Sequence, residues 1–329
     1  MARLRSVSPR IRRLARIAAG VIVVVAIVAT VGAGPFIRGL TSVSPLSVAA
    51  ALLLTGIATA AAAWRWRVVA AGLGLELSWR GAIAAYYRSQ FLNTVLPGGV
   101  IGDIHRAYRH GRRSGDLALA ARAVVTERAA GQLVQFALAT VVLTLLGLTS
   151  PFRGLAWVAG GVMAIILIGI AIIATTARGR HFLDRELRML SELFRDPGRF
   201  VQIVASSTVV VASHTAVFVI ACVGTGVHAS LTELFAIALI VLCAAAVPIN
   251  VGGWGPREGA AASAFAVVGL GAAAGVAAST AFGVLATIAL LPGAAVLLAD
   301  RIRVARAHRL PTQPADEEIT ERQIEEVPA

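Results

Sequence analysis

The chain has 329 residues, of which 57% are hydrophobic and only 14% are charged. Soluble domains have about 45–50% apolar and about 25% charged residues, and several apolar runs here reach the roughly 20 residues that span a bilayer. The composition therefore excludes a soluble enzyme, a secreted disulfide scaffold and a disordered chain. It predicts an all-α, polytopic integral membrane protein.

The net charge is +13, and all 30 basic residues are arginine. Cytoplasmic loops of membrane proteins collect arginine, which accounts for this charge better than nucleic-acid binding does. If the apolar runs cross the membrane alternately, 25 of the 30 arginines fall on one side. The segments on that side are 1–16, 64–80, 106–122, 178–199 and 301–322. We therefore predict a multi-pass protein of the plasma membrane with both termini in the cytoplasm.

The apolar runs give about six predicted spans in chain order. After a basic cytoplasmic N-terminus at 1–16, the spans are predicted at about 17–37, 45–63, 118–148, 155–177, 200–222 and 274–299. The second span ends in Trp64-Arg65-Trp66-Arg67, which is typical of an interfacial anchor. Residues 17–300 are predicted to form the transmembrane domain, and 301–329 a cytoplasmic tail with a disordered acidic end.

Two segments interrupt the apolar pattern in the same way. Each has a proline, then a glycine cluster, then an arginine nine residues after the proline, and both residues recur at an offset of 151. The first copy has Pro97, Gly98, Gly99, Gly102 and Arg106, and the second has Pro248, Gly252, Gly253, Gly255 and Arg257. Proline stops a helix and glycine permits unusual dihedral angles. Each copy therefore predicts a re-entrant helical hairpin, at about 80–106 and 231–258.

Three predicted spans separate the two hairpins, so the halves around 80–148 and 231–299 are expected to form an inverted repeat. Paired, interrupted hydrophobic segments indicate a transporter site near the bilayer midplane. Restarting helices offer free N–H groups to anions, and arginine binds phosphate bidentately. The predicted substrate-binding residues are Arg88, Asn93, Asp103, Arg106, Glu127, Arg128, Arg257 and Glu258.

Each of these residues also has a structural interpretation. Asp103 is a candidate cap for the restarting helix, Arg106 a cytoplasmic positive charge, and Glu127-Arg128 a set of structural ion pairs. The prolines and glycines of both copies are predicted to act as backbone hinges. No catalytic residue, metal ligand or cofactor is predicted.

The same residues resemble the family of the lysylphosphatidylglycerol synthase transmembrane region, the flippase-like half of bacterial multiple-peptide-resistance proteins. The marks that match are Arg88, Asn93, Leu96 to Gly99, Gly102-Asp103, Arg106, Glu127-Arg128, Pro248, Gly252-Gly253, Gly255 and Arg257-Glu258. The resemblance covers about residues 17–300. It implies re-entrant helices and the movement of a phospholipid or another lipid-linked anion between leaflets. The aminoacyl-transferase domain of the bifunctional members is missing, so lipid aminoacylation is not expected. The last span also lacks the aromatic–arginine pair of many members.

These observations predict a lipid translocase rather than an enzyme, with membrane lipids as its substrates and a lipid-modifying enzyme as a candidate partner. No Gly-x-x-x-x-Gly-Lys-Ser/Thr loop for nucleotides occurs. One alternative is an integral-membrane transferase that uses a polyprenyl-phosphate-linked donor, although the sequence has no Asp-x-Asp motif. Another is a non-transporting membrane scaffold. The sequence leaves open the headgroup, the direction, the energy source and the oligomeric state.

Overall fold

The computed structural model describes residues 31–96, 99–147, 174–247 and 254–307, with a few single positions within 25–29 and 164–172. In these ranges the regular structure is helical, apart from a single bridge residue at Trp254. The all-α prediction is therefore confirmed there. The predicted spans at about 17–37 and 155–177 lie largely outside the described residues, as do both chain ends.

Four helical stretches in the described ranges are long and apolar enough to cross a membrane. They are α3 (Pro45–Gly72), α6 (Leu117–Gly147), α9 (Pro197–Gly224), and α12 (Ala272–Ala289) together with α13 (Leu291–Ala307). Each coincides with a predicted apolar run. The protein is therefore a helical membrane protein.

The helices follow the same order twice along the chain. In the first half, α3 precedes the short helices α4 (Trp79–Val95) and α5 (Ile101–Ser114), and α6 follows them. In the second half, α9 precedes α10 (Leu231–Ala245) and α11 (Pro256–Val267), and α12 follows. The leading helices of both halves have 28 residues, begin at a proline and end at a glycine. The breaks that the sequence predicted near 97 and 248 both fall between two short helices.

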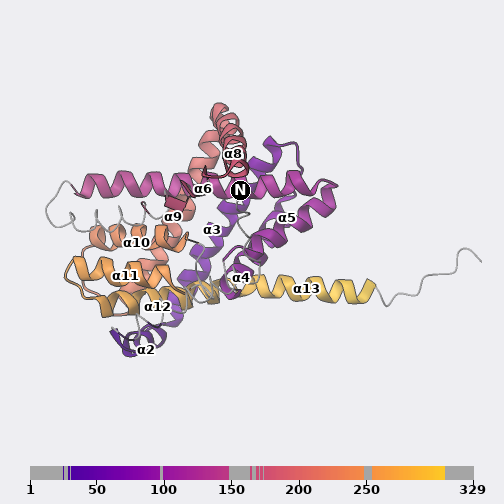
Figure 1. Ribbon diagram of the computed structural model, residues 1–329. Helices are drawn as coiled ribbons and strands as arrows, with labels where there is room; N and C mark the ends of the chain where they lie inside the picture. Colours follow the sequence, from indigo (N-terminus) through magenta and orange to yellow (C-terminus); the bar gives the residue numbers. More distant parts are fainter. Residues whose placement is uncertain are drawn as a thin grey trace, which may run out of the picture.

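The two halves pack against each other through their long helices. α3 lies against α9, and α6 contacts both α5 and α10, so it joins the two groups of short helices (Figure 1). Within the described ranges, the largest apolar core lies mainly among α9, α10, α11 and α12, includes Phe218, Ile237 and Phe265, and has a few members from α3 and α6. The α4–α5 pair contributes no described residue to this core, since α4 packs on α3 and α13 and α5 packs on α6.

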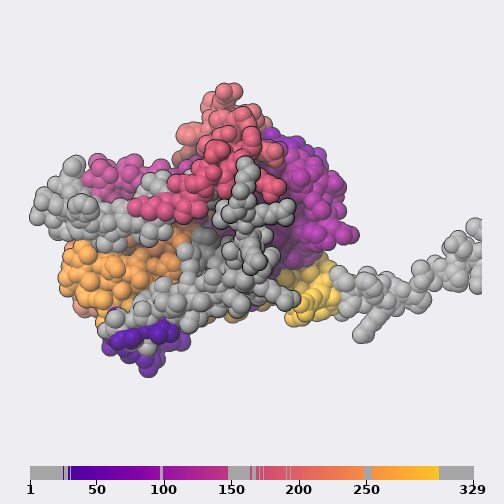
Figure 2. Space-filling view, viewed as in Figure 1, coloured from indigo at the N-terminus to yellow at the C-terminus, as the bar shows by residue number. Residues whose placement is uncertain are grey.

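Two further helices lie outside this arrangement. The short α2 (Gly34–Thr41) packs on α12, where Gly39 is in close contact with Ala277 and Thr280. The amphipathic α8 (Ala177–Arg195) packs on α6 and α9 and projects from the body of the molecule (Figure 2). The sequence had predicted only an arginine-rich loop there.

The second predicted span differs from the helix in the structure. α3 continues past residue 63 to Gly72, and within the predicted anchor Arg65 and Trp66 are buried. Trp64 remains 42% exposed, with the Arg67 guanidinium 5.5 Å from its ring. The interfacial prediction is therefore wrong for Arg65 and Trp66, because at 3.6 residues per turn only residues 64 and 67 of the four share a face.

The last predicted span is interrupted. α12 ends at Ala289 and α13 begins at Leu291, where Pro292 cannot donate a backbone hydrogen bond. Gly293 lies against α4, where an added Cβ would overlap the carbonyl group of Tyr87. This contact brings the C-terminal helix beside the first hairpin.

Candidate functional site

The first broken segment is held together by contacts between α4 and α5. Gly102 lies so close to α4 that an added Cβ would overlap the backbone carbonyl of Ser89. The Asn93 side chain accepts a hydrogen bond from the Gly102 N–H at 2.7 Å. The start of α5 is thus capped by the preceding helix, because Val100 at the N-cap position makes no side-chain cap bond. The predicted capping role of Asp103 is wrong.

Asp103 instead joins three helices through its two carboxylate oxygens. Oδ1 accepts from Ser89 at 2.9 Å and pairs with Arg106 at 3.2 Å. Oδ2 accepts from Asn93 at 3.0 Å and from Arg128 of α6 at 2.6 Å. Both oxygens are occupied, so Asp103 positions the surrounding side chains. Asp103 also lies in the first turn of α5, where the helix dipole stabilises a negative charge.

Glu127 of α6 is the centre of a fully buried charge cluster. Its Oε1 accepts from Arg65 Nε at 2.9 Å, from Arg65 Nη2 at 2.6 Å and from the Tyr86 hydroxyl at 2.7 Å. Its Oε2 accepts from Arg106 Nη2 at 2.9 Å. One carboxylate therefore lies between two arginines, and the cluster remains positively charged.

Arg106 is 1% exposed, and its guanidinium lies over two aromatic rings. Its guanidinium carbon lies 4.5 Å from the centre of the Trp66 ring and 4.2 Å from that of Tyr86. In the described part of the chain, its buried Nε and Nη1 have no hydrogen-bond partner. Such buried donors carry a desolvation penalty that an anionic ligand would remove.

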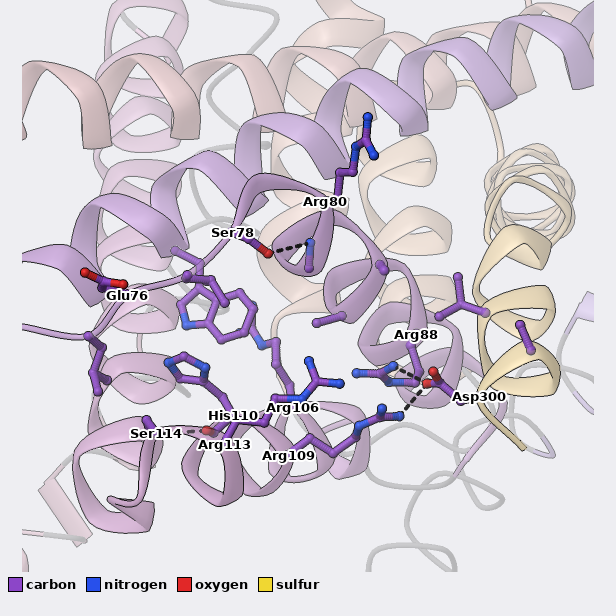
Figure 3. A pocket seen from close by; sticks show the side chains of 18 of the residues that line it. Glu76, Ser78, Arg80, Arg88, Arg106, Arg109, His110, Arg113, Ser114 and Asp300 are labelled. Carbon is purple, nitrogen blue, oxygen red and sulfur yellow. Dashed lines mark hydrogen bonds and ion pairs between the residues drawn. The ribbon is translucent and has the colours of Figure 1, made fainter. Parts of the chain in front are cut away.

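A second group of charges connects the hairpin to α13. Arg88 of α4 donates from Nη1 to Asp300 Oδ2 at 2.6 Å, and Arg109 of α5 donates to the same oxygen. Figure 3 shows both guanidinium groups directed at Asp300. A single carboxylate of the C-terminal helix thus holds two arginines from two other helices.

A cavity of about 820 Å³ lies where α4, α5 and α13 meet the end of α3 and the loop at 73–78. Its lining carries two carboxylates, Glu76 and Asp300, and six arginines. These arginines are Arg80, Arg88, Arg106, Arg109, Arg113 and Arg303. The formal charge of the lining is therefore six minus two, or +4. A concave site with this charge attracts anions.

His110 also lines the cavity and adds no charge at neutral pH. Burial lowers the pKa of His110, and the positive charges of Arg113 and Arg106 lower it further. Its ring packs edge-on against Trp66, and within the described residues its Nε2 has no hydrogen-bond partner. Figure 3 shows His110 on the same side of the cavity as Arg106.

The second broken segment has a different local structure. Glu258 is fully buried and accepts from the Gly255 N–H at 2.7 Å, which caps α11. Arg257 pairs with Glu258 and donates from Nε to Ser279 at 3.1 Å. Gly283 leaves room for this arginine, since an added Cβ would overlap the guanidinium. This arginine and carboxylate are matched one to one, unlike the charges near α5.

The structure therefore divides the predicted substrate-binding residues, all of which it describes, into three groups that share no hydrogen bond or ion pair with one another. Five belong to the network around α4, α5 and α6: Asn93, Asp103, Arg106, Glu127 and Arg128. Arg88 pairs instead with Asp300 of α13. Two, Arg257 and Glu258, belong to the α11–α12 contact.

Of the predicted hinges, Pro97, Gly98, Pro248, Gly252 and Gly253 lie outside the described residues. Gly99 has φ of +62° and Gly255 of +135°, values that favour glycine.

Sequence reasoning missed several residues that pair with the predicted ones. Arg65 was assigned to the interface, and Tyr86 was passed over although it lies two residues before Arg88. Asp300 gave a usable signal, because it is an acidic residue at the end of an apolar run and such residues are costly there. Among the described residues, no group of three or more histidine, cysteine, aspartate or glutamate side chains is placed to hold a metal ion.

Comparison with known families agrees with these motifs. The family model described as the lysylphosphatidylglycerol synthase TM region matches residues 13–293 and so includes both broken segments and α12. No curated protein and no solved structure gave a significant match. The chain belongs to the lysylphosphatidylglycerol synthase TM-region family.

Proposed function

We propose that the protein is a lipid translocase that moves an anionic phospholipid or a lipid-linked phosphate between leaflets. The observation that carries this proposal is the cavity of about 820 Å³ with six arginines beside the broken α4–α5 hairpin. Family membership supports a membrane role that concerns lipids. In this proposal the cavity receives the headgroup while the acyl chains remain in the bilayer.

The proposed orientation follows from the arginine distribution. Most of the cavity lining comes from the segments 66–81, 106–114 and 296–303. These segments overlap three of the arginine-rich segments that are predicted to be cytoplasmic. The cavity would then open toward the cytoplasmic leaflet, where anionic lipids attract basic side chains.

The proposed pathway uses the two halves differently. The α4–α5 hairpin would be re-entrant and would hold the headgroup through Arg88, Arg106 and Arg109. The α10–α11 hairpin would enter from the opposite side as the inverted copy of the repeat. Its Arg257 is already paired with Glu258, which supports a role in positioning the second hairpin against α12.

The direct test is leaflet exchange in proteoliposomes. The purified protein is reconstituted with phosphatidic acid that carries a fluorescent label on an acyl chain, and a membrane-impermeant reductant abolishes the fluorescence of the outer leaflet. If lipids do not cross, only the outer half of the fluorescence is lost. Translocation predicts that more than half of the fluorescence is lost, because lipids from the inner leaflet reach the reductant. Arg88→Gln and Arg109→Gln should slow the exchange, whereas the matched control Arg112→Gln should not. Arg112 is exposed on the same helix as Arg109 and does not line the cavity.

Equal label loss with and without protein would contradict the proposal for this lipid. Equal rates for Arg88→Gln, Arg109→Gln and wild type would contradict the assignment of the cavity as the headgroup site. Each variant is first checked by gel filtration and thermal denaturation, so that a loss of exchange is not a loss of fold.

A further inference from the structure

We infer that the cavity selects a phosphate group with at least two negative charges, a phosphomonoester or a diphosphate, and that this group displaces Asp300 from Arg88 and Arg109. The inference rests on the proposed function, because it takes the same cavity as the headgroup site. It goes further by naming the charge class of the ligand and the protein group with which the ligand competes.

The first argument is the charge that the cavity leaves uncompensated. Six arginines and two carboxylates line it. Behind the wall, Glu127 is shared by Arg65 and Arg106, and Asp103 by Arg106 and Arg128. Three arginines thus share these two inner carboxylates, so one positive charge remains in excess there as well. A phosphodiester supplies one negative charge, whereas a phosphomonoester near neutral pH supplies close to two.

The second argument is the number of buried donors without acceptors. In the described part of the chain, Arg88 Nε, Arg106 Nε and Arg106 Nη1 are buried and unpartnered. Both arginines line the cavity and are at least nine-tenths buried. A terminal phosphate offers three strong acceptor oxygens, while a diester offers only two that are not bridging. The donor set therefore fits a terminal phosphate better.

The third argument is the geometry at Asp300. The Nη1 atoms of Arg88 and Arg109 converge on one carboxylate oxygen, Oδ2. This arrangement shows that two guanidinium groups from different helices already hold a single anionic oxygen. A phosphate group can present separate oxygens to the two arginines, and bidentate pairing of arginine with phosphate is strong. In this inference the Asp300 carboxylate occupies the position that the ligand's phosphate would take.

The same lining disfavours a cationic headgroup. An amine would need a free carboxylate, yet Asp300 is paired with two arginines and Glu76 lies apart from them in Figure 3. The remaining lining charges are all positive. Repulsion from six arginines would oppose the entry of an aminoacylated lipid.

The test measures binding to the full-length protein in detergent, separately from transport. Calorimetry compares inorganic pyrophosphate with dimethyl phosphate, and native mass spectrometry compares bound dioleoylphosphatidic acid with dioleoylphosphatidylglycerol. We expect pyrophosphate to bind at least about tenfold more tightly than dimethyl phosphate. Phosphatidic acid should likewise be retained over phosphatidylglycerol. Asp300→Asn should tighten pyrophosphate binding several-fold, Arg88→Gln and Arg109→Gln should weaken it about tenfold, and Arg112→Gln should leave it unchanged.

The outcomes separate this inference from the proposed function. Equal affinity for pyrophosphate and dimethyl phosphate, with equal retention of the two lipids, would overturn the charge class. Unchanged or weaker pyrophosphate binding by folded Asp300→Asn would overturn the displacement of Asp300. Binding of pyrophosphate without phosphatidic acid would support the charge class but assign it to a soluble phosphate compound, which contradicts the lipid function. Selective lipid binding without leaflet exchange would support the inference and contradict translocation.

Discussion

Removal of the Glu127 charge should strongly destabilise the protein. Glu127 is fully buried and accepts four hydrogen bonds, two from Arg65, one from Tyr86 and one from Arg106. In Glu127→Gln the shape is kept, but two buried guanidinium groups lose their shared counter-charge. Loss of one partner from a buried ion pair costs about 3–5 kcal/mol of unfolding free energy. At about 2 °C per kcal/mol, the melting temperature should fall by about 6–10 °C.

The assay is thermal unfolding of the detergent-solubilised protein, followed by intrinsic tryptophan fluorescence. Glu192→Gln is the matched control, because this glutamate is exposed on α8, and its melting temperature should stay within about 1 °C of wild type. Adding Arg65→Gln to Glu127→Gln should cost less than the sum of the two single changes, since the pair is coupled. Strict additivity, or a melting temperature of Glu127→Gln equal to that of the control, would refute the reasoning.

Further predictions concern close packing and caps, and the same unfolding assay checks them. Gly102→Ala should lower the melting temperature by several degrees, because its Cβ would overlap the Ser89 carbonyl and separate α4 from α5. Gly259→Ala in α11 is its control, since nothing lies within 4 Å of the added Cβ, and it should be neutral or slightly stabilising. Asn93→Ala should cost about 1–2 kcal/mol, because the Gly102 N–H and Asp103 both lose a partner, and a change below about 0.3 kcal/mol would contradict the cap. Gly283→Ala should destabilise the protein by displacing Arg257 from Glu258 and Ser279, and wild-type stability would show that this pair tolerates movement. Cys222 and Cys243 are buried in α9 and α10, so maleimide should label them only as the protein unfolds, and rapid labelling of the native protein would contradict that burial.

The fold class and the positions of the long helices could be predicted because a long apolar run in a chain this poor in charge is stable chiefly as a helix that crosses a bilayer. The runs at 45–63, 118–148 and 200–222 all correspond to helices. The ends of the helices were harder to predict from the sequence. α3 extends to Gly72 because Arg65 finds Glu127 and Ser207 in other helices, and sequence alone does not display such partners.

The candidate site was predictable to the level of residue types. Arg88, Asn93, Asp103, Arg106, Glu127 and Arg128 were named from a broken hydrophobic pattern, and the structure gathers them near one hairpin. Their pairings depend on contacts up to 212 residues apart, as between Arg88 and Asp300, so local spacing does not reveal them. The symmetry of the two motifs also suggested similar chemistry in both, whereas Arg257 has its ion pair with the adjacent Glu258 and Arg106 pairs with Glu127 of α6 as well as with Asp103.

The position of α13 makes it responsive to whatever occupies the cavity. Gly293 and Asp300, about two helical turns apart, attach this helix to α4 by backbone contact and by charge, respectively. If an incoming anion takes the two arginines, α13 keeps its backbone contact with α4 at Gly293 but loses its charge contact at Asp300, so the end of the helix can move relative to α4. A pair of dyes, one near Ala307 and one on α8, would then report occupancy as a change in energy transfer, without any label on the lipid.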